Sequence, residues 1–328
     1  MSKIFTYADG VRDGFNFILK KYKDSLVMGQ GVWSPWYVGS TMKNLDKKYG
    51  KKRIIDTPVS ENAVTGAALG ASLEGKKVIV VHPRMDFMLY CMDPIINQAA
   101  KWSTIFSAKS KGSFTVRAII NRGGEQGAQH SQSLHSLFVH VPGVKVLMPS
   151  FANDARDLLI SAVNANFPVL YIDDRWLYET SEKIKKPKIL DINKLKPKKI
   201  KNGDRLTIIG CGYGTKIALD VDELLKKESI TSDIFDLRVL TDISYKEIIK
   251  SVKKTGRIAC IDAAWPQCSV SSEVISSILE NLDPMFLKSK PLKFNIKNAP
   301  APTSSYLEKH YYLNKKKIFN KIYSSLKI

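Results

Sequence analysis

Arg53-Ile-Ile-Asp-Thr-Pro-Val-Ser-Glu61-Asn-Ala-Val-Thr-Gly-Ala-Ala-Leu-Gly-Ala-Ser-Leu73 is a segment in which two structural patterns follow each other directly. Ile54 and Ile55 form a short apolar run that ends in turn residues, as a buried strand does. From Asn62 the sequence is rich in Ala and Gly with Leu at helical spacing, and such small side chains let a helix lie close against a neighbour. The segment therefore predicts a strand that leads into a tightly packed helix.

Short apolar runs and helical patterns alternate on both sides of this segment. Such alternation predicts a mostly parallel sheet covered by helices, and thus an α/β fold. A lysine-rich stretch divides the pattern, so we expect two three-layer domains, 1–180 and 202–328, joined by a linker at 181–201. The predicted strands are 26–28, 54–55, 78–81, 114–120, 144–148, 169–172, 206–209, 234–238 and 257–262, and the predicted helices include 62–73, 88–102, 154–164, 245–253 and 272–279.

The composition is that of an ordinary globular protein, with 44% hydrophobic and 25% charged residues in 328. No apolar stretch approaches the roughly 20 residues that cross a bilayer, and the N-terminal residues 1–5 lack the features of a secretory signal. We expect a soluble, cytoplasmic protein without membrane contact. The cysteines are scattered and form no Cys-x-x-Cys pair, which predicts reduced thiols rather than disulfides or a zinc site at Cys91, Cys211, Cys260 and Cys268.

The net charge of +20 comes from 51 Lys and Arg residues against 31 Asp and Glu residues. Such a balance is compatible with an anionic partner, nucleic acid included. However, 41 of the 51 basic residues are lysines spread along the chain, and clusters of arginines interleaved with aromatics are absent. A lysine-biased composition or an acidic partner subunit therefore explains the charge better than nucleic-acid binding.

Three loops that follow predicted strands carry informative residues, at Gly29, at Glu61 and in Arg122-Gly-Gly-Glu-Gln-Gly-Ala-Gln-His130. Ligands of parallel α/β sheets bind beyond the carboxyl ends of the strands. Taken alone, Ser60 and Glu61 also suit a helix N-cap and its first turn. His130 is either a proton-transfer group in a loop whose glycines let backbone approach a ligand, or a structural histidine.

Gly210-Cys-Gly-Tyr-Gly214 is similar to the glycine-rich loop of dinucleotide-binding folds. That fingerprint requires Gly-x-Gly-x-x-Gly, and the third glycine stands one residue early here. We therefore predict a tight strand-to-helix turn rather than a nucleotide site.

Taken together and in this order, several segments resemble the β subunit of the thiamine-dependent, decarboxylating component of 2-oxo acid dehydrogenase complexes, of the pyruvate, branched-chain and acetoin types. The resemblance covers nearly the whole chain and implies a transketolase-type pyrimidine-binding domain followed by the transketolase C-terminal domain. The segments are 53–62, 85–88, 92–102, 129–134, 140–146, 148–150, 235–240, 265–267 and 301–304.

The resemblance implies roles for residues of the first domain. Glu61 would hydrogen-bond the aminopyrimidine ring of thiamine diphosphate and favour the imino form that removes the thiazolium proton. A carboxyl group in this role needs a dry setting that raises its pKa, which the neighbouring Val59, Ala63 and Val64 permit. Phe87 would pack on the aminopyrimidine, with core packing as the alternative. Gln30 stands where many family members have acidic residues near the cofactor, so we assign it to the cofactor site.

His130 matches the family histidine that faces the substrate or the acyl-carrying intermediate. The resemblance implies an acid or an electrostatic stabiliser there, with a structural hydrogen bond as the alternative. Gln129, which precedes it, is a candidate substrate contact. These assignments make Glu61 and His130 the predicted catalytic residues.

One family motif is missing from the chain. Family members that carry the diphosphate site have Gly-Asp-Gly followed by Asn-Asn, and the nearest string here is Gly203-Asp-Arg205 in the second domain. Because magnesium prefers oxygen ligands beside phosphate oxygens, we expect no metal ligands on this chain. The resemblance then implies that an α subunit holds Mg²⁺ and the diphosphate, in an assembly of two α and two β chains.

Arg84 marks a departure from the family pattern. Together with Asp174-Arg-Trp176, the string His82-Pro-Arg84 resembles a less studied branch, often thought to serve sugar or surface-polysaccharide biosynthesis. Arg84 either binds a carboxylate or phosphate of the substrate, or is a surface or interface arginine.

Three functions are compatible with these observations. The first and preferred one is a decarboxylating dehydrogenase component that passes an acyl group to a lipoyl acyltransferase. The second is a transketolase-like transferase that acts on a sugar or aldehyde acceptor. The third is a non-catalytic homologue, which the presence of Glu61, Phe87 and His130 disfavours.

Overall fold

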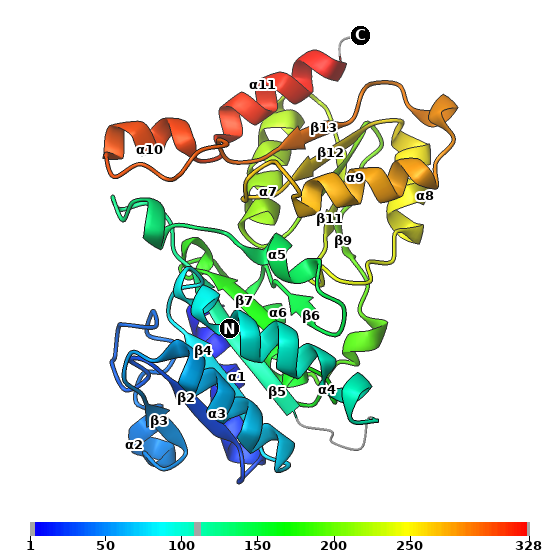
Figure 1. The fold of residues 1–328 in the computed structure, drawn as a ribbon. Helices are drawn as coiled ribbons and strands as arrows, with labels where there is room; N and C mark the ends of the chain where they lie inside the picture. Colours follow the sequence, from blue (N-terminus) through cyan, green and yellow to red (C-terminus); the bar gives the residue numbers. More distant parts are fainter. Residues whose placement is uncertain (1–3, 108–112, 327–328) are drawn as a thin grey trace. The chain divides into compact units, whose positions relative to one another are not determined.

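A computed structural model describes residues 4–107 and 113–326 of the chain, so residues 1–3 of the N-terminal prediction lie outside the described part. The chain divides into two α/β units, each built around its own sheet (Figure 1). The first unit comprises Met1–Arg122 and Leu137–Leu195, and the second comprises Gly123–Ser136 and Lys196–Ile328. The loop predicted to carry His130 therefore groups with the second unit. Each unit confirms the predicted α/β fold class.

The first unit contains a six-stranded parallel sheet in the order β3-β2-β4-β5-β7-β6. Its central strands are short, apolar and almost fully buried, as expected of a sheet covered on both faces. The strands are β2 (Leu26–Gly29), β3 (Ile54–Asp56), β4 (Lys77–His82), β5 (Ser113–Ile120), β6 (Lys145–Leu147) and β7 (Val169–Asp174).

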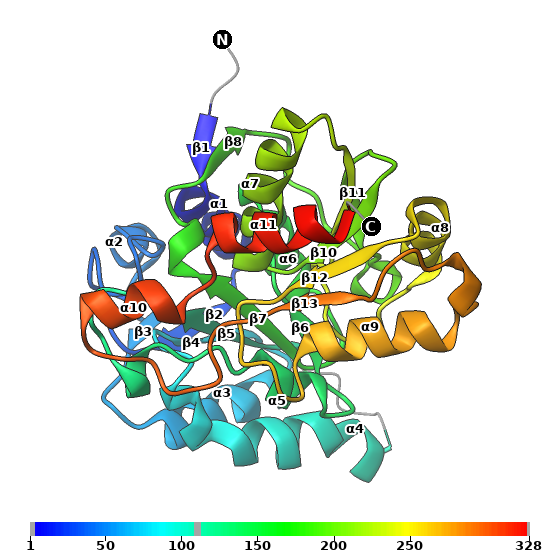
Figure 2. The same cartoon turned by 90° about the horizontal axis from the view of Figure 1, so that it is seen from above.

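Helices cover both faces of this sheet (Figure 2). On one face α1 (Tyr7–Lys21) packs against α6 (Ala152–Ala162), and Gly10 allows the close approach: a Cβ there would lie 2.2 Å from the carbonyl oxygen of Ala152. The other face carries α3 (Glu61–Leu73) and α4 (Ala100–Ile105). Short elements of this unit are β1 (Ile4–Thr6), which pairs with β8 (Ser181–Lys183), and α2 (Leu45–Tyr49), η4 (Arg175–Leu177) and η5 (Ile192–Lys194). The short helix α5 (His135–Val139) crosses the division, because His135 and Ser136 group with the second unit and the rest of the helix with the first.

The helix predicted at 88–102 forms, but its hydrogen-bond pattern changes along its length. It begins as the 3₁₀ helix η1 (Phe87–Cys91), continues as the π-helix η2 (Asp93–Ala99) and ends as α4. Pro94 lies at the start of η2 and has no N–H to donate to the preceding turn, which accounts for the irregular pattern.

The second unit contains a five-stranded sheet in the order β13-β12-β10-β11-β9, in which only the edge strand β9 is antiparallel. Figures 1 and 2 show α7 and α11 on one face of this sheet and α8 and α9 on the other. The strands are β9 (Lys198–Lys201), β10 (Leu206–Gly210), β11 (Ser232–Asp236), β12 (Ile258–Ile261) and β13 (Leu292–Phe294); the helices are η3 (Ala128–His130), α7 (Tyr213–Lys227), α8 (Lys246–Thr255), α9 (Val270–Glu280), η6 (Pro284–Phe286), α10 (Ser305–Tyr311) and α11 (Lys315–Leu326).

The turn predicted at Gly210–Gly214 is confirmed, because β10 ends at Gly210 and α7 begins at Tyr213. Its glycines allow the turn to pack closely against neighbouring backbone. A Cβ on Gly214 would lie 2.3 Å from the carbonyl oxygen of Ile261, and one on Gly210 would lie 2.7 Å from the nitrogen of Thr215. In the described residues of both units, no helix combines the length and the apolar character that a membrane span requires.

Candidate functional site

Glu61 is the first residue of α3 and lies at the carboxyl edge of the first sheet, just beyond β3. Its side chain is half-buried. Ser60 occupies the N-cap position and Glu61 is the acidic residue of the first turn, as the helix-cap interpretation predicted, although the side chain of Ser60 makes no capping hydrogen bond. The setting around Glu61 is open on this chain, since Val59 is 78% exposed and Ala63 is exposed.

One turn into α3, Thr65 begins a buried polar cluster. Its hydroxyl lies 3.1 Å from Nε2 of His82 and donates to the sulfur of Cys91 at 3.2 Å. Burial lowers the pKa of His82 to about 4, so the imidazole is neutral. Burial raises the pKa of the Cys91 thiol to about 11, and the negative charge of Glu61 adds to this shift. Glu61 therefore lies within electrostatic reach of the end of η1, the turn that begins with the half-buried Phe87.

Gln30 lies in a loop that packs directly on neighbouring backbone. A Cβ on Gly29 would lie 2.3 Å from the carbonyl oxygen of Val81, and one on Gly31 would lie 2.1 Å from Cδ1 of Tyr37. Both glycines have positive φ angles, of 158° and 64°. The loop thus depends on glycine at both sides of the half-buried Gln30, which holds this residue beside the end of β4.

Arg84 follows β4 and lies near a second arginine. Burial lowers the pKa of Arg84, and the positive charge of Arg175 lowers it further, while Asp86 and Tyr37 act in the opposite direction. Arg175 donates to the carbonyl oxygen of Tyr37. Arg84 and Arg175 therefore follow the carboxyl ends of β4 and β7 and are close enough for their charges to interact. The segment of Arg175 stands out in the sequence, but Arg175 itself was not predicted as a site residue.

Gln129 and His130 lie in the short turn η3 of the second unit, with Gln129 exposed and His130 half-buried. The loop before this turn is held by the C-terminal part of the chain. The N–H of Gly123 donates to the hydroxyl oxygen of Tyr312 at 3.0 Å, and the N–H of Glu125 donates to the carboxylate of Glu308 at 3.1 Å.

Further contacts fix the same loop. The N–H of Ser305 donates to the carboxylate of Glu125 at 2.9 Å, and a Cβ on Gly127 would lie 2.5 Å from Cγ2 of Thr303. Glu125 adopts a φ of 59°, in the left-handed region. These anchors come from residues nearly 200 positions further along the chain, and the sequence carried no signal that would have found them.

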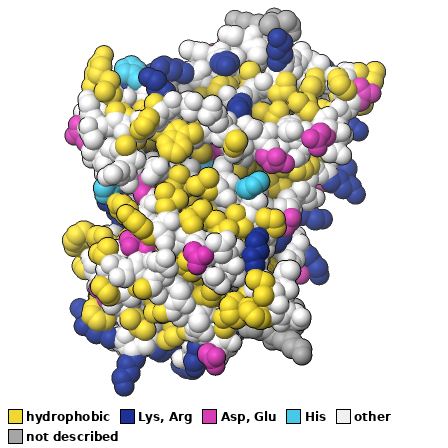
Figure 3. All heavy atoms as spheres, viewed as in Figure 1, with side chains coloured by type: hydrophobic (Ala, Val, Ile, Leu, Met, Phe, Trp, Pro, Cys, Tyr) yellow, Lys and Arg dark blue, Asp and Glu magenta, His cyan; other side chains and the backbone are white. Residues whose placement is uncertain are grey.

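The predicted site residues thus fall into separate groups. Gln30 and Arg84 lie together at the carboxyl edge of the first sheet, Glu61 and Phe87 lie on the packed elements α3 and η1, and Gln129 and His130 share η3. On the face of the molecule shown in Figure 3, Lys and Arg side chains are scattered and do not form the continuous stripe expected for nucleic acid.

Comparisons with known proteins agree with this architecture. Residues 4–180 match the family described as the transketolase pyrimidine binding domain, and residues 196–318 match the transketolase C-terminal domain. A solved structure described as a split-gene transketolase, an inactive β4 tetramer, superposes with a TM-score of 0.78 over 98% of both chains at 16% identity. A transketolase from Campylobacter jejuni gives a TM-score of 0.70 over 98% of this chain and 47% of its own, at 15% identity.

Relatives match over almost the full length. The chain is 29% identical over 327 residues to the β subunit of acetoin:2,6-dichlorophenolindophenol oxidoreductase of Bacillus subtilis, covering 95% of this chain and 94% of that protein. It is 30% identical over 305 residues to the pyruvate dehydrogenase E1 component β subunit of Rickettsia bellii, covering 93% of each. The chain therefore belongs to the family of E1-type dehydrogenase β subunits built from the transketolase pyrimidine-binding and C-terminal domains.

Proposed function

We propose that this chain is the β subunit of an enzyme that uses thiamine diphosphate to decarboxylate a 2-oxo acid such as pyruvate, and that Glu61 activates the cofactor. The observation that carries this proposal is the position of Glu61, a half-buried carboxyl group on the first residue of α3 at the carboxyl edge of the sheet. Ligands of such sheets bind at this edge.

The residues of this chain fit the aminopyrimidine half of the cofactor. Glu61 supplies a carboxyl group whose flank on α3 consists of small residues, and Phe87 supplies a half-buried aromatic ring on the helix that packs against α3. When bound, thiamine diphosphate would supply nucleophilic chemistry toward the carbonyl group of the substrate. Glu61 holds a proton at the aminopyrimidine ring, and Phe87 orients this ring by stacking on it.

The surroundings of Glu61 support completion of the site by another chain. A carboxyl group that must share a proton needs a dry environment, yet Val59 and Ala63 are exposed. The outer face of α3 continues with exposed Gly66 and Gly70, where an added Cβ would meet nothing within 4 Å. A helix or loop of an α subunit can approach this face closely and exclude water from Glu61.

The metal and diphosphate belong, in this proposal, to the α subunit. Among the described residues, the only group of three or more His, Cys, Asp and Glu side chains close enough to share an ion is His135, Cys211 and Asp262. A thiol and an imidazole do not suit Mg²⁺, which prefers oxygen ligands. Relatives are named as β subunits, which supports an α partner, and we propose an assembly of two α and two β chains in the cytoplasm.

His130 is proposed to act on the substrate as an acid or electrostatic stabiliser, with Gln129 as a neighbouring contact. The several hydrogen bonds that anchor the loop of η3 support this role, because a catalytic side chain must be held in place. The product acyl group would then pass to a lipoyl acyltransferase.

A transketolase-like transferase is the second candidate, and the arginine pair favours it. The charges of Arg84 and Arg175 interact at the carboxyl edge of the first sheet, and two neighbouring arginines suit a phosphate or carboxylate on the substrate. Under this candidate the acceptor is an anionic sugar or aldehyde rather than a lipoyl group.

The test of the proposal uses the complex of this chain with its α partner. We expect Glu61→Gln to slow both proton exchange at the thiazolium carbon and decarboxylation of pyruvate by at least about 10²-fold, with the complex intact on gel filtration. Glu74→Gln, at the exposed C-terminal end of the same helix, is the matched control and should retain full activity. If Glu61→Gln exchanges the thiazolium proton at the wild-type rate, Glu61 does not activate the cofactor. Addition of lipoamide or of an anionic aldehyde acceptor to the wild-type complex then distinguishes the two candidates.

A further inference from the structure

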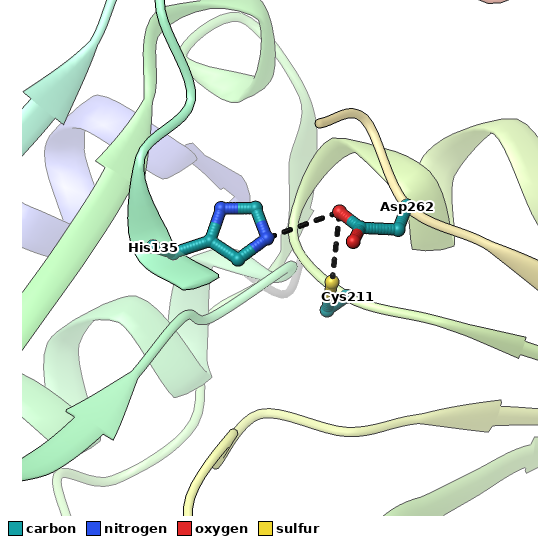
Figure 4. Close-up of side chains that lie close together, drawn as sticks. All are labelled: His135, Cys211 and Asp262. Carbon is teal, nitrogen blue, oxygen red and sulfur yellow. Dashed lines mark hydrogen bonds and ion pairs between the residues drawn. The ribbon is translucent and has the colours of Figure 1, made fainter. Parts of the chain in front are cut away.

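Three side chains from distant parts of the chain meet inside the second unit (Figure 4). His135 follows the loop of η3, Cys211 lies in the turn after β10, and Asp262 directly follows β12. Each is at most 2% exposed. One imidazole nitrogen, one sulfur and one carboxylate oxygen all lie within 4.8 Å of one another.

We propose that these three residues bind a transition-metal ion, with Zn²⁺ as the preferred metal. Thiolate, imidazole and carboxylate are the side-chain ligands of zinc, and neither the sequence pattern nor the family relationship assigns them here. The site is structural in kind: it fastens the segment after η3 to the ends of β10 and β12. The inference stands independently of the thiamine chemistry proposed above.

The distances suit a small ion. Nε2 of His135 lies 3.0 Å from Oδ1 of Asp262, and the sulfur of Cys211 lies 3.9 Å from the same oxygen. Zinc bonds of roughly 2.0–2.3 Å in a tetrahedral site separate the ligand atoms by roughly 3.3–3.7 Å. Shifts of less than about one ångström in the side chains therefore bring all three atoms to bonding distance, with a fourth position for water.

The surrounding groups orient the ligands as outer partners of a metal site do. Nδ1 of His135 lies 3.2 Å from the hydroxyl oxygen of Ser133, which fixes the ring and leaves Nε2 facing the cluster. The other carboxylate oxygen of Asp262 accepts from the N–H of Ser271 at the start of α9, at 3.4 Å. One oxygen is thus held by the backbone while Oδ1 is directed toward the two other ligands (Figure 4).

Charge also favours an ion at this position. A thiolate and a carboxylate neutralise the two positive charges of Zn²⁺, so the occupied site carries no net charge in a dry interior. A nucleophilic Cys–His pair is a poorer interpretation, because the carboxylate oxygen contacts both other groups and all three side chains are buried.

The test measures metal on the full-length chain purified with its α partner. After loading with Zn²⁺ and dialysis against a weak chelator, we expect about one zinc ion per β chain beyond the content of the α chain purified alone. Replacement by Co²⁺ should give the visible bands of a tetrahedral site together with a thiolate-to-metal charge-transfer band.

Variants locate the ion. Cys211→Ser should remove the charge-transfer band, whereas Cys268→Ser, at an exposed thiol, should keep it. Ser133→Ala retains all three ligands and should weaken Co²⁺ binding by roughly 10–100-fold, which gives a readout even if Cys211→Ser does not fold. A β chain that holds no zinc after loading, or a charge-transfer band that survives in Cys211→Ser, overturns the proposal and leaves a metal-free hydrogen-bonded cluster.

Discussion

The backbone N–H of Gly123 donates a hydrogen bond to the hydroxyl oxygen of Tyr312 at 3.0 Å, although 189 residues separate the two in the sequence. This contact begins a series that holds the loop of η3 to α10 and its flanking residues. The position of His130 is therefore set by the C-terminal part of the chain, and mutations there should affect catalysis without touching the cofactor.

Tyr312→Phe should lower kcat by roughly tenfold or less while leaving the affinity for thiamine diphosphate unchanged. The variant removes one acceptor worth about 1 kcal/mol and leaves the N–H of Gly123 unsatisfied, so the loop becomes less ordered. Tyr323→Phe is the matched control, because the hydroxyl of Tyr323 bonds an exposed carboxylate on the surface of the same unit. Steady-state kinetics of the complex provide the measurement. Equal kcat values in the two variants would show that the loop needs no such anchor.

Asp173→Asn should destabilise the chain by about 3–5 kcal/mol, because it leaves the Arg117 guanidinium charged and unpaired in the interior. The two side chains are fully buried on neighbouring strands and lie 2.7 Å apart, and the hydroxyl of Tyr178 donates to the same carboxylate. Glu247→Gln breaks an exposed pair with Lys250 and should cost less than about 1 kcal/mol. Urea unfolding measures both variants, and similar losses in the two would contradict the interpretation.

Stability should fall as the pH drops below about 6.5, with His82 as a main cause. Burial lowers the folded-state pKa of His82 to about 4. Between this pKa and that of the unfolded chain, His82 is protonated in the unfolded chain and neutral in the folded chain. The stability that depends on neutral His82 is fully present above the pKa of the unfolded chain and is lost progressively toward pH 4. The free energy of unfolding should fall by about 2 kcal/mol between pH 7.5 and pH 5 for this reason. His82→Gln should flatten this part of the stability profile, while His140→Gln, at an exposed site, should not. If the free energy of unfolding of His82→Gln falls with pH as steeply as that of the wild type, His82 is not the cause.

Substitution should affect the stability of the chain at Gly10 but not at Gly70. Gly10→Ala places a methyl group against the backbone of Ala152 and should destabilise the chain by about 1–3 kcal/mol, since α1 must move away from α6.

Gly70→Leu adds a side chain to the open face of α3, and should change the stability of the isolated chain by less than about 1 kcal/mol. The same variant should prevent pairing with the α subunit. Normal assembly of Gly70→Leu, measured by light scattering, would show that this face is not the interface.

Much of the architecture follows from local pattern. The apolar runs and the Ala- and Gly-rich helix specify buried strands and close packing, and the structure places β2, β3, β4 and β5 within a few residues of the predicted bounds. The short edge strands β1, β8, β9 and β13 were not predicted, because their alternation is too brief and β9 consists largely of lysines. The change from 3₁₀ to π hydrogen bonding after Phe87 also depends on packing that periodicity does not report.

In the candidate site, too, contacts between distant segments could not be predicted from local sequence patterns. Glu61 and His130 were found because ordered motifs surround them, and the roles assigned to them remain predictions. Tyr312 and Asp262 matter through partners far away in sequence, so nothing in their own neighbourhoods identified them. The segment of Arg175 stood out in the sequence, but its position near Arg84 did not. The cysteine spacing predicted no zinc site, whereas the fold brings Cys211 to a histidine and an aspartate from other segments.

The division of the active site between two chains is the central claim, and turnover by separated and mixed subunits tests it most directly. The β chain alone and the α chain alone, each with pyruvate, thiamine diphosphate and Mg²⁺, should release no carbon dioxide above background. The mixed chains should decarboxylate pyruvate, and Mg²⁺-dependent cofactor binding should follow the α chain. Cofactor binding with Mg²⁺ and turnover by the β chain on its own would contradict the account.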